Sequence, residues 1–499
     1  MKRINWVLIG IFVLGFLVRL YRFDNPVADW HAFRQSDTNA VSTIFAREGI
    51  NLLYPKYFDI SNIQSGIDNP RGYRFVEFPI YNAIQAGLFK VFAVGCQANP
   101  PDGCTGLLTL EQWGRLISIL ATLAGAFFVY ALTKKYATET TGFFAAFFYL
   151  FLPFSIFFGR TILPDPSMAA SILAGIYFFD RWLEGILNSK KQIANIHIKY
   201  QIFLALSVFF TGLAFLLKPF ALFFTIPMIY LAWKKFGFGL FKSWQLWLFG
   251  VLAISPLILW RWWIGHYPEG IPVSSWLFNG DRIRFRPAFF RWIGFERVTK
   301  LILGYTGILL LAVGCWRVVK NKNAGFFLSF ALASALYVSV IATGNVRHDY
   351  YQIAIIPTIS IFAGLGAAML FAILAKRSGG IIAGFTIGII ILSSFYFSWM
   401  LVRDYFNIND RGMVSAGKYA DEILPYDAIV IAPYDGSTTL LNASARRGWP
   451  TFQEPIEKLI ERGATHLVIA NPTPSDFRGF GTMYEQIASS KEYLILKLK

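Results

Sequence analysis

The sequence predicts an all-α polytopic membrane protein of about eleven membrane-spanning helices, with a small α/β domain at its C-terminal end. Three observations lead to this fold class. Hydrophobic types make up 55% of the 499 residues and charged types only 15%, whereas soluble domains carry about 25% charged residues. Apolar runs recur along residues 1–401, and many approach the length of about 20 residues that a membrane span needs. Connections with several basic residues alternate with connections that hold few, as the positive-inside rule requires.

The expected spans follow from the apolar runs, judged against that length. They are 4–21, 113–133, 141–158, 167–183, 201–217, 219–233, 244–263, 299–317, 325–342, 351–375 and 381–401. The first run follows Lys2 and Arg3, and no small-residue cleavage site comes after it. We therefore expect an uncleaved first span rather than a signal peptide.

Lysine and arginine in the short loops predict the orientation. With a cytoplasmic N-terminus, each short outer connection holds one basic residue, namely Arg160, Lys218 and Arg347. The inner connections hold Lys134, Lys135, Arg181, Lys190, Lys191, Lys199, Lys234, Lys235, Lys242, Arg317, Lys320, Lys322, Lys376 and Arg377. The net charge of +17 indicates a membrane as partner rather than nucleic acid, because the basic residues lie between apolar runs. We expect the protein in the cell (inner) membrane.

Three longer segments fall on the extracytoplasmic side, namely 22–112, 264–298 and 402–499. The first contains Ile80–Val94, which predicts an amphipathic helix at the outer membrane interface. The last forms the expected second domain, after a membrane module over 1–401. Its helix-like stretches are 413–424, 438–447 and 454–462, and its strand-like stretches are 428–432, 466–470 and 493–498.

Unusual polar residues gather at the outer ends of the spans. Arg34 and Asp37 lie three apart and would share a helix face, although a surface ion pair explains them too. Glu77 precedes the interfacial helix, where the helix dipole alone favours an acid. Asp165 follows the third span, where helix capping explains it well, but capping explains the nearby Arg160 poorly.

Lys218 stands between two apolar runs with almost no loop around it. A charge at this depth is costly, so it is either functional or paired, or it snorkels to the interface. The outer loop 281–291 carries four arginines, which suit phosphate oxygens or simply solvent. Residues 347–351 read Arg-His-Asp-Tyr-Tyr and also suit an interfacial belt. Each feature is weak alone, and their convergence on one face predicts a site.

A membrane-surface site with carboxylates and cations suits a lipid-linked phosphate donor. Lysine and arginine would hold the phosphate and stabilise the charge of the leaving group. A carboxylate would act as general base on an acceptor hydroxyl, and a polyprenyl tail would lie between helices. The sequence has no glycine-rich phosphate loop, which disfavours a soluble nucleotide donor.

Five short motifs, in order along residues 1 to about 375, resemble those of the GT-C superfamily. They are Arg-Gln-x-Asp-Thr (34–38), Glu-Phe-Pro (77–79), Arg-x-x-x-Pro-Asp (160–165), Leu-Leu-Lys-Pro (216–219) and His-x-Tyr-Tyr (348–351). Within that superfamily the chain is similar to the family-39 protein O-mannosyltransferases and to the aminoarabinose transferases that modify lipid A.

The resemblance implies an inverting glycosyltransferase that takes a sugar from a polyprenyl monophosphate. It implies catalytic roles for three carboxylates and donor-phosphate contacts for five further residues, namely Asp37, Glu77 and Asp165, and Arg34, Arg160, Lys218, His348 and Tyr350. Many relatives have Asp-Glu where this chain has Asp37-Thr38, so a second local carboxylate for a metal is missing. Some members use a divalent cation and others do not, so metal use stays open.

Two other functions stay open at this point. One is a transporter or flippase of lipid-linked sugars, and the other is a non-catalytic envelope assembly subunit. The clustering of charge at one face favours an enzyme, because transporters place charges near the membrane centre. The sugar and the acceptor, which is a hydroxyl or a phosphate on a lipid, glycan or protein, cannot be identified from the sequence. Cys96 and Cys104 lie in an outer loop, where an oxidising compartment would allow a disulfide, and Cys315 reads as a packing residue.

Overall fold

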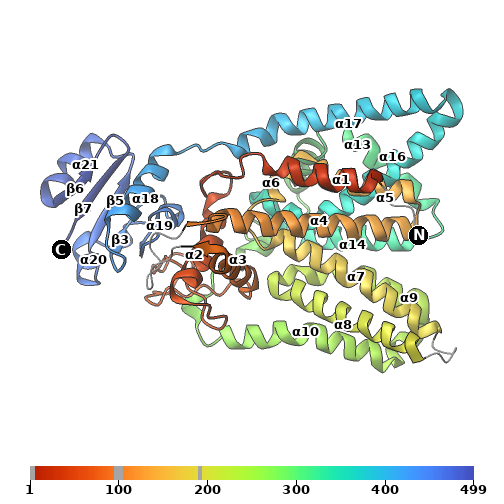
Figure 1. The fold of residues 1–499 in the computed structure, drawn as a ribbon, viewed down its shortest axis with the longest axis horizontal. Coiled ribbons are helices and arrows are strands. Elements are labelled where there is room, and N and C mark those ends of the chain that lie inside the picture. The colour runs from red at the N-terminus through yellow and green to blue at the C-terminus, as the bar shows by residue number, and fades with distance from the viewer. Residues whose placement is uncertain (1–5, 95–104, 189–193) are drawn as a thin grey trace.

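The apolar runs form a bundle of helices along the longest axis of the molecule, and a sheet domain stands beyond one end of that bundle (Figure 1). The computed structural model describes residues 6–94, 105–188 and 194–499. Cys96 and Cys104 lie outside the described residues, so their expected disulfide stays a prediction.

The bundle contains long helices and several shorter helical segments. They are α1 (Trp6–Leu17), α4 (Leu110–Tyr136), α5 (Glu139–Phe151), α6 (Pro153–Phe158), α7 (Asp165–Asn188), α8 (Ala194–Leu217), η2 (Pro219–Thr225), α9 (Ile226–Phe236), α10 (Trp244–Ile264), η5 (Arg291–Ile302), α13 (Gly307–Val319), α14 (Ala324–Val340), η6 (Asp349–Ile355), α16 (Ile356–Ser378) and α17 (Gly380–Val402). Each expected span coincides with one of these helices or with two consecutive ones.

Proline breaks explain why several spans are split. Pro153 begins α6 just after α5 ends, Pro219 begins η2, and Pro227 stands at the start of α9. Each proline interrupts the preceding helix, because proline cannot donate the hydrogen bond that continues a helix. By length and apolar composition, five helices among the described residues can cross a membrane. The number is six if the pair 287–302 and 307–319, bent by 115°, forms one span. The expected count of about eleven stays a prediction.

Apolar side chains are exposed along the outer helices of the bundle. Ile381, Phe385 and Leu392 of α17 are mostly exposed, as are Trp247 and Trp262 of α10. Both helices lie at the edges of the bundle (Figure 1). An apolar helix that faces outward needs an apolar surrounding, so the bundle is that of a multi-pass membrane protein.

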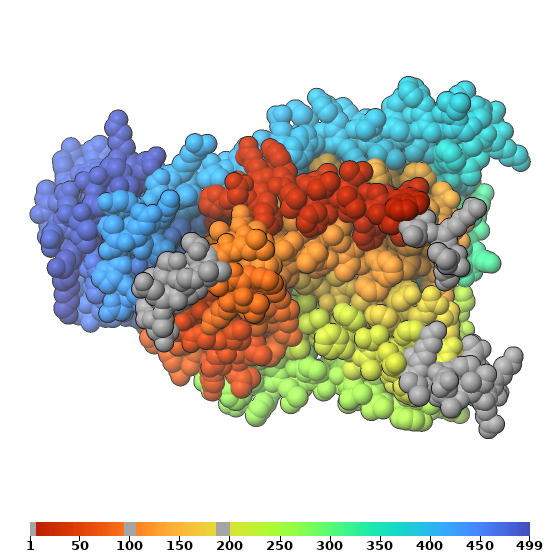
Figure 2. All heavy atoms as spheres, in the orientation of Figure 1, coloured from red at the N-terminus to blue at the C-terminus, as the bar shows by residue number. Residues whose placement is uncertain are grey.

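The first outer segment lies between the bundle and the sheet domain, as the red and orange atoms in Figure 2 show. It contains α2 (Ala32–Glu48), α3 (Ile80–Phe92) and the two-stranded pair β1 (Ala93–Val94) and β2 (Thr105–Gly106). The expected amphipathic helix over 80–94 therefore exists as α3. Shorter segments complete the outer face, namely η1 (Val18–Leu20), η4 (Pro268–Gly270), α11 (Trp276–Asn279), α12 (Pro287–Phe290), α15 (Ala342–Arg347) and η7 (Arg403–Phe406), while η3 (Gly237–Lys242) joins α9 to α10.

The C-terminal domain has a five-stranded mixed sheet with the order β4-β3-β5-β7-β6. Its elements are α18 (Arg411–Ile423), β3 (Ile429–Ile431), α19 (Thr439–Ser444), β4 (Arg447–Trp449), α20 (Ile456–Glu461), β5 (His466–Ala470), α21 (Pro474–Arg478), α22 (Phe480–Met483), β6 (Glu485–Ser489) and β7 (Tyr493–Lys497). Strand β3 runs parallel to β4 and to the central strand β5, and β7 runs antiparallel to both β5 and β6. The small α/β domain expected over 402–499 is therefore present.

The first outer segment is joined to this sheet by backbone and side-chain contacts. The amide of Ile60 donates to the carbonyl of Gly448 at 3.0 Å, and the amide of Gly448 donates to the carbonyl of Phe58 at 2.9 Å. Val41 and Phe45 of α2 share one apolar cluster with residues of α18 and α19. The sheet domain thus rests on α2, the helix that carries Arg34 and Asp37.

Candidate active site

Helix α2 is unusual because its polar side chains are buried. Twelve of its 17 residues are buried, and Arg34, Gln35, Ser36 and Asp37 are among them. The residue before it, His31, has a left-handed backbone with φ of 57°, an uncommon conformation for a residue other than glycine. Helices α3, α4 and α19 contact α2, so Arg34 and Asp37 lie inside the protein rather than in water. The alternative of a surface ion pair is therefore wrong.

A chain of alternating charges joins four separate parts of the sequence. Arg34 forms a charged hydrogen bond with Glu77. The Nζ atom of Lys218 lies 3.3 Å from Oε1 of Glu77 and 3.3 Å from Oδ2 of Asp165. Lys218 is only 5% exposed, so it is buried and paired and does not snorkel.

Short local features hold this charge chain in place. Lys218 lies between the last residue of α8 and Pro219, where the helix breaks. The amide of Phe78 donates to the carbonyl of Leu216 at 3.0 Å, which fixes Glu77 beside the end of α8. Asp165 is the first residue of α7. Its Oδ2 atom accepts no hydrogen bond from the described residues, so its charge depends on Lys218.

Asp37 is held by two groups that the sequence did not single out. Its Oδ2 atom accepts from Arg74 at 2.5 Å, and its Oδ1 atom accepts from the hydroxyl of Thr438 at 2.7 Å. Asp37 is 2% exposed. Arg74 also lies 5.0 Å over the ring of Tyr57. The bonded acid is thus oriented from two sides, by the first outer segment and by the sheet domain.

Asp37 and two members of the charge chain, Arg34 and Glu77, face one small cavity. Arg34, Asp37, Arg74 and Glu77 line it, as does Pro164, which precedes Asp165. Its volume is about 20 Å³, which is room for about one water molecule. The site is therefore closed around its charges.

The electrostatics keep Glu77 and Arg34 charged. Burial raises the pKa of Glu77, but the positive charges of Arg34 and Lys218 outweigh it and lower that pKa to about 2. For Arg34, burial lowers the pKa, but the negative charge of Glu77 outweighs it and raises that pKa above its ordinary value. For Asp165, burial outweighs the positive charge of Lys218 and raises the pKa. Three carboxyl groups and three basic side chains meet in a small buried volume.

An aromatic group stands beside Lys218. The Nζ atom of Lys218 lies 5.7 Å from the ring centres of Tyr350 and Tyr351, and these two rings stack on each other at 4.5 Å. The ring of His348 lies 5.7 Å from that of Tyr350. Burial and the nearby His31 lower the pKa of His348 to about 4, so this imidazole is neutral at physiological pH. Tyr350 therefore borders the charge chain, while His348 stands behind it.

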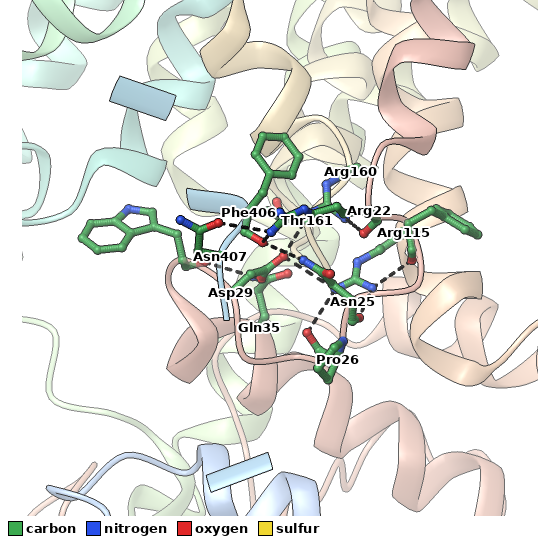
Figure 3. A network of polar contacts seen from close by, with 12 residues as sticks. Arg22, Asn25, Pro26, Asp29, Gln35, Arg115, Arg160, Thr161, Phe406 and Asn407 are labelled. Atoms are coloured by element: carbon green, nitrogen blue, oxygen red, sulfur yellow. Dashed lines mark hydrogen bonds and ion pairs between the residues drawn. The ribbon is translucent and has the colours of Figure 1, made fainter. Parts of the chain in front are cut away.

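Arg160 belongs to a different buried network (Figure 3). It is 1% exposed and its Nη2 atom lies 3.0 Å from Oδ2 of Asp29. Arg115 lies 3.7 Å from the same oxygen, and the amide of Gln35 donates to Asp29 at 2.7 Å. Arg160 also donates to the carbonyl of Arg22 at 2.8 Å. These contacts join α2 and α4 to the loops that carry Arg22, Asp29 and Arg160, so the structure gives Arg160 a different set of partners from the one expected.

The remaining basic candidates lie at the surface, and the described residues form no metal-binding cluster. Arg347 pairs with Asp281 and is exposed, and Arg282, Arg286 and Arg291 are exposed as well. Among residues 6–94, 105–188 and 194–499, no group of three or more His, Cys, Asp or Glu side chains could hold a metal ion. Sequence reasoning missed Arg74, Thr438 and Asp29. Of these, only Arg74 stands near a motif, three residues before Glu77.

Comparison with known proteins agrees with this architecture. The model of the family described as dolichyl-phosphate-mannose-protein mannosyltransferase matches residues 108–263, which include Asp165 and Lys218. No curated protein matches the sequence. This family model covers less than a third of the chain, so it shows a likeness of that segment to the family.

Two solved proteins illustrate the likeness. ArnT from Cupriavidus metallidurans, in a structure bound to undecaprenyl phosphate, superposes with a TM-score of 0.64 at 12% identity, over 99% of this chain and 98% of its own. The oligosaccharyltransferase of Archaeoglobus fulgidus superposes with a TM-score of 0.56 at 12% identity, over 92% of this chain and 69% of its own. The chain is thus an ArnT-like protein in fold.

Proposed function

We propose that this protein transfers a sugar from a polyprenyl-monophosphate donor to an acceptor hydroxyl on the extracytoplasmic face of the membrane, with inversion at the anomeric carbon. The observation that supports this most is the buried cluster in which Asp37 and Arg74 adjoin the chain from Arg34 to Asp165. Buried ion pairs do not stabilise a fold efficiently, and charges at such helix ends are costly unless they have a function. The structural likeness to ArnT supports the choice of a lipid-phosphate donor.

In the proposed reaction Asp37 is the general base. The acceptor oxygen attacks the anomeric carbon, and its proton passes to the carboxylate of Asp37. The bond between the anomeric carbon and the phosphate oxygen breaks, and its electron pair stays on the phosphate oxygen. Attack opposite to the leaving group inverts the anomeric configuration. Arg74 holds the carboxylate in the orientation that proton transfer requires.

Lys218 and Arg34 would stabilise the departing phosphate. Lys218 has three N–H donors, and its Nζ atom lies 3.3 Å from both Glu77 and Asp165 in the closed site. Glu77 and Asp165 thus act on the cations, by fixing their positions before the donor arrives, and Tyr350 completes that side of the site. Preorganised cations of this kind stabilise the charge of a leaving group without reorganising. Any divalent cation would add to this charge, and the closed cavity must open for the donor.

Basic residues in the connections support the proposed orientation, with a cytoplasmic N-terminus and an extracytoplasmic sheet domain, in the cell (inner) membrane. The sheet domain and the site lie at the same end of the bundle (Figure 1), so both would face the extracytoplasmic side. A transporter or flippase would need charged groups along a path through the bundle, whereas these gather at one end. An assembly subunit would need no oriented base.

A donor panel tests the proposal. The purified full chain in lipid nanodiscs is incubated with labelled polyprenyl-phosphate mannose, glucose, galactose and aminoarabinose, together with solubilised membrane extract as the source of acceptor. We expect label to leave one donor and appear in a product that resists mild acid, with release of polyprenyl phosphate. Retention of label on every donor, by protein with an intact unfolding transition, would count against the enzyme.

A further inference from the structure

A second cavity lies beside the closed site. It has a volume of about 540 Å³ and is bordered on one side by residues 30–33, at the start of α2, and on the other by the loop 434–439 of the sheet domain. Thr438 belongs to the lining of this cavity and also donates to Asp37. Thr438 therefore stands between this cavity and the carboxylate that the proposed reaction uses.

The lining has the chemistry of a carbohydrate site. Trp30 and Phe33 are 40% and 36% exposed, and both border the cavity. The ring of Trp30 is fixed, because it stacks on Tyr405 at 4.8 Å. Fixed aromatic faces offer apolar area at low entropic cost, and Asp435 and Gln64 add polar groups that can bond to hydroxyls.

The charge of the lining narrows the ligand class. Among the described residues that border this cavity, none is lysine or arginine. A phosphorylated or otherwise anionic acceptor needs cationic partners, and here it would instead meet the carboxylate of Asp435. The lining therefore favours a neutral ligand that carries several hydroxyl groups.

The contact between Thr438 and Asp37 shows how such a ligand would reach the base. The Thr438 hydroxyl donates to Oδ1 of Asp37 at 2.7 Å, and Thr438 is buried. This is the hydrogen bond that an acceptor hydroxyl makes before it loses its proton. The loop that carries Thr438 includes two consecutive residues with left-handed backbone, Asp435 and Gly436. Withdrawal of this loop would give the position of the Thr438 hydroxyl to the acceptor.

Resting on the proposed function, we infer that the acceptor is a neutral sugar unit that binds between residues 30–33 and the loop 434–439, and that its hydroxyl replaces that of Thr438 at Asp37. The acceptor oxygen then forms the new bond to the anomeric carbon. The glycosyl–phosphate bond breaks toward the phosphate, and Asp37 keeps the proton. The sheet domain thus determines which acceptor enters the site.

Saturation-transfer NMR on the full chain in nanodiscs tests this inference. The probes are cellobiose, maltose and chitobiose, with glucose 6-phosphate and a neutral serine peptide as the other classes. We expect at least one disaccharide to bind, and Asp435→Asn to weaken that binding about fivefold or more, the size of one lost bond to a charged group. The matched control Asp427→Asn, an exposed aspartate of the same domain, should bind as the wild type does.

The inference is overturned if the phosphorylated sugar or the peptide binds and no disaccharide does. It is overturned equally if no probe binds, or if disaccharide binding is the same in Asp435→Asn. Binding of polyprenyl phosphate is measured on the same samples. If no disaccharide binds but polyprenyl phosphate does, the acceptor class is refuted and the proposed reaction is not.

Thr438→Ala gives a second, kinetic readout once a transferring donor is known. Removing the hydroxyl that occupies the base should lower the acceptor KM, by up to about tenfold for one such bond, and should retain kcat. Thr438→Ser should behave as the wild type does. A kcat that falls a hundredfold in Thr438→Ala and recovers in Thr438→Ser would contradict displacement, because Thr438 would then be a positioning residue.

Discussion

Replacing Lys218 by methionine removes the cation that joins two of the buried acids, while it keeps a side chain of similar length. In the native protein Nζ lies 3.3 Å from both Asp165 and Glu77. Glu77 keeps Arg34 as a partner after the change. Asp165 keeps no ion-pair partner within 4.0 Å among the described residues, so the loss falls mainly on Asp165.

The expected magnitude follows from that imbalance. Leaving one buried charge without its partner costs about 3–5 kcal/mol. Neutralising the acid as well should recover part of this cost, so Lys218→Met with Asp165→Asn should be more stable than the sum of the two single changes by about 1–3 kcal/mol. Lys322→Met, at an exposed loop lysine, should change the free energy of unfolding by less than about 0.5 kcal/mol.

The assay is the free energy of unfolding of the four proteins and the control in mixed micelles, read by loss of tryptophan fluorescence. Binding of polyprenyl phosphate is measured in parallel and should weaken in every protein that lacks Lys218. The reasoning fails if the two changes add without coupling. It also fails if Lys218→Met is as stable as the wild type, because Lys218 would then be solvated and unpaired.

Three further outcomes follow from the buried charges. Since the pKa of Glu77 lies at about 2, its ion pairs should stabilise the fold by about 3 kcal/mol at pH 7 and lose that contribution as pH falls from about 4.5 toward 2; Glu77→Gln and wild type should converge in unfolding free energy at about pH 2, and an equal gap at both pH values would contradict this. Since the pKa of His348 is about 4, His348→Gln should leave the pH profile of donor binding unchanged between about pH 5.5 and 8, and loss of a titration step in that range would show a cationic role. Arg160→Met leaves Asp29 with Arg115 as a cation, so it should cost about 1–3 kcal/mol of stability, with donor Kd within twofold of the wild type; a Kd raised tenfold in folded protein would return Arg160 to the donor site.

Most of the bundle could be predicted from the sequence, because the length of apolar runs and the positions of prolines are local signals. Each expected span coincides with helical structure, and the strands expected at 428–432, 466–470 and 493–498 appear as β3, β5 and β7. Strand β4 was missed because Arg447-Gly448-Trp449 has no apolar alternation. Its place in the sheet comes from partners on both sides, one of them in the first outer segment.

The candidate site could be predicted from the sequence only in part. Helix ends with unpaired charges pointed to Asp37, Glu77, Asp165 and Lys218, and the structure brings these residues together. Spacing suggested that Arg34 pairs with Asp37, but Arg34 pairs with Glu77 instead, because the loop before α3 returns to α2.

The partners that the sequence did not reveal are distant or irregular in the chain. Asp37 is bonded to Thr438, which is 401 residues away, and to Arg74, which lies in a segment without helix or strand. Asp29 is an unremarked loop residue that accepts from Arg160 across 131 positions. Contacts of this kind depend on the packing of the sheet domain and the first outer segment, and no local pattern encodes them.

The most direct test of the account is Asp37→Asn, measured for turnover and for donor binding on the same preparation. The amide keeps the size of the side chain but cannot accept the proton of the acceptor. The account predicts a loss of kcat of at least about a hundredfold, the usual contribution of a general base, with the Kd for polyprenyl phosphate within about threefold of the wild type. Turnover near the wild-type rate in folded Asp37→Asn would contradict it, because the reaction would then proceed without this carboxylate.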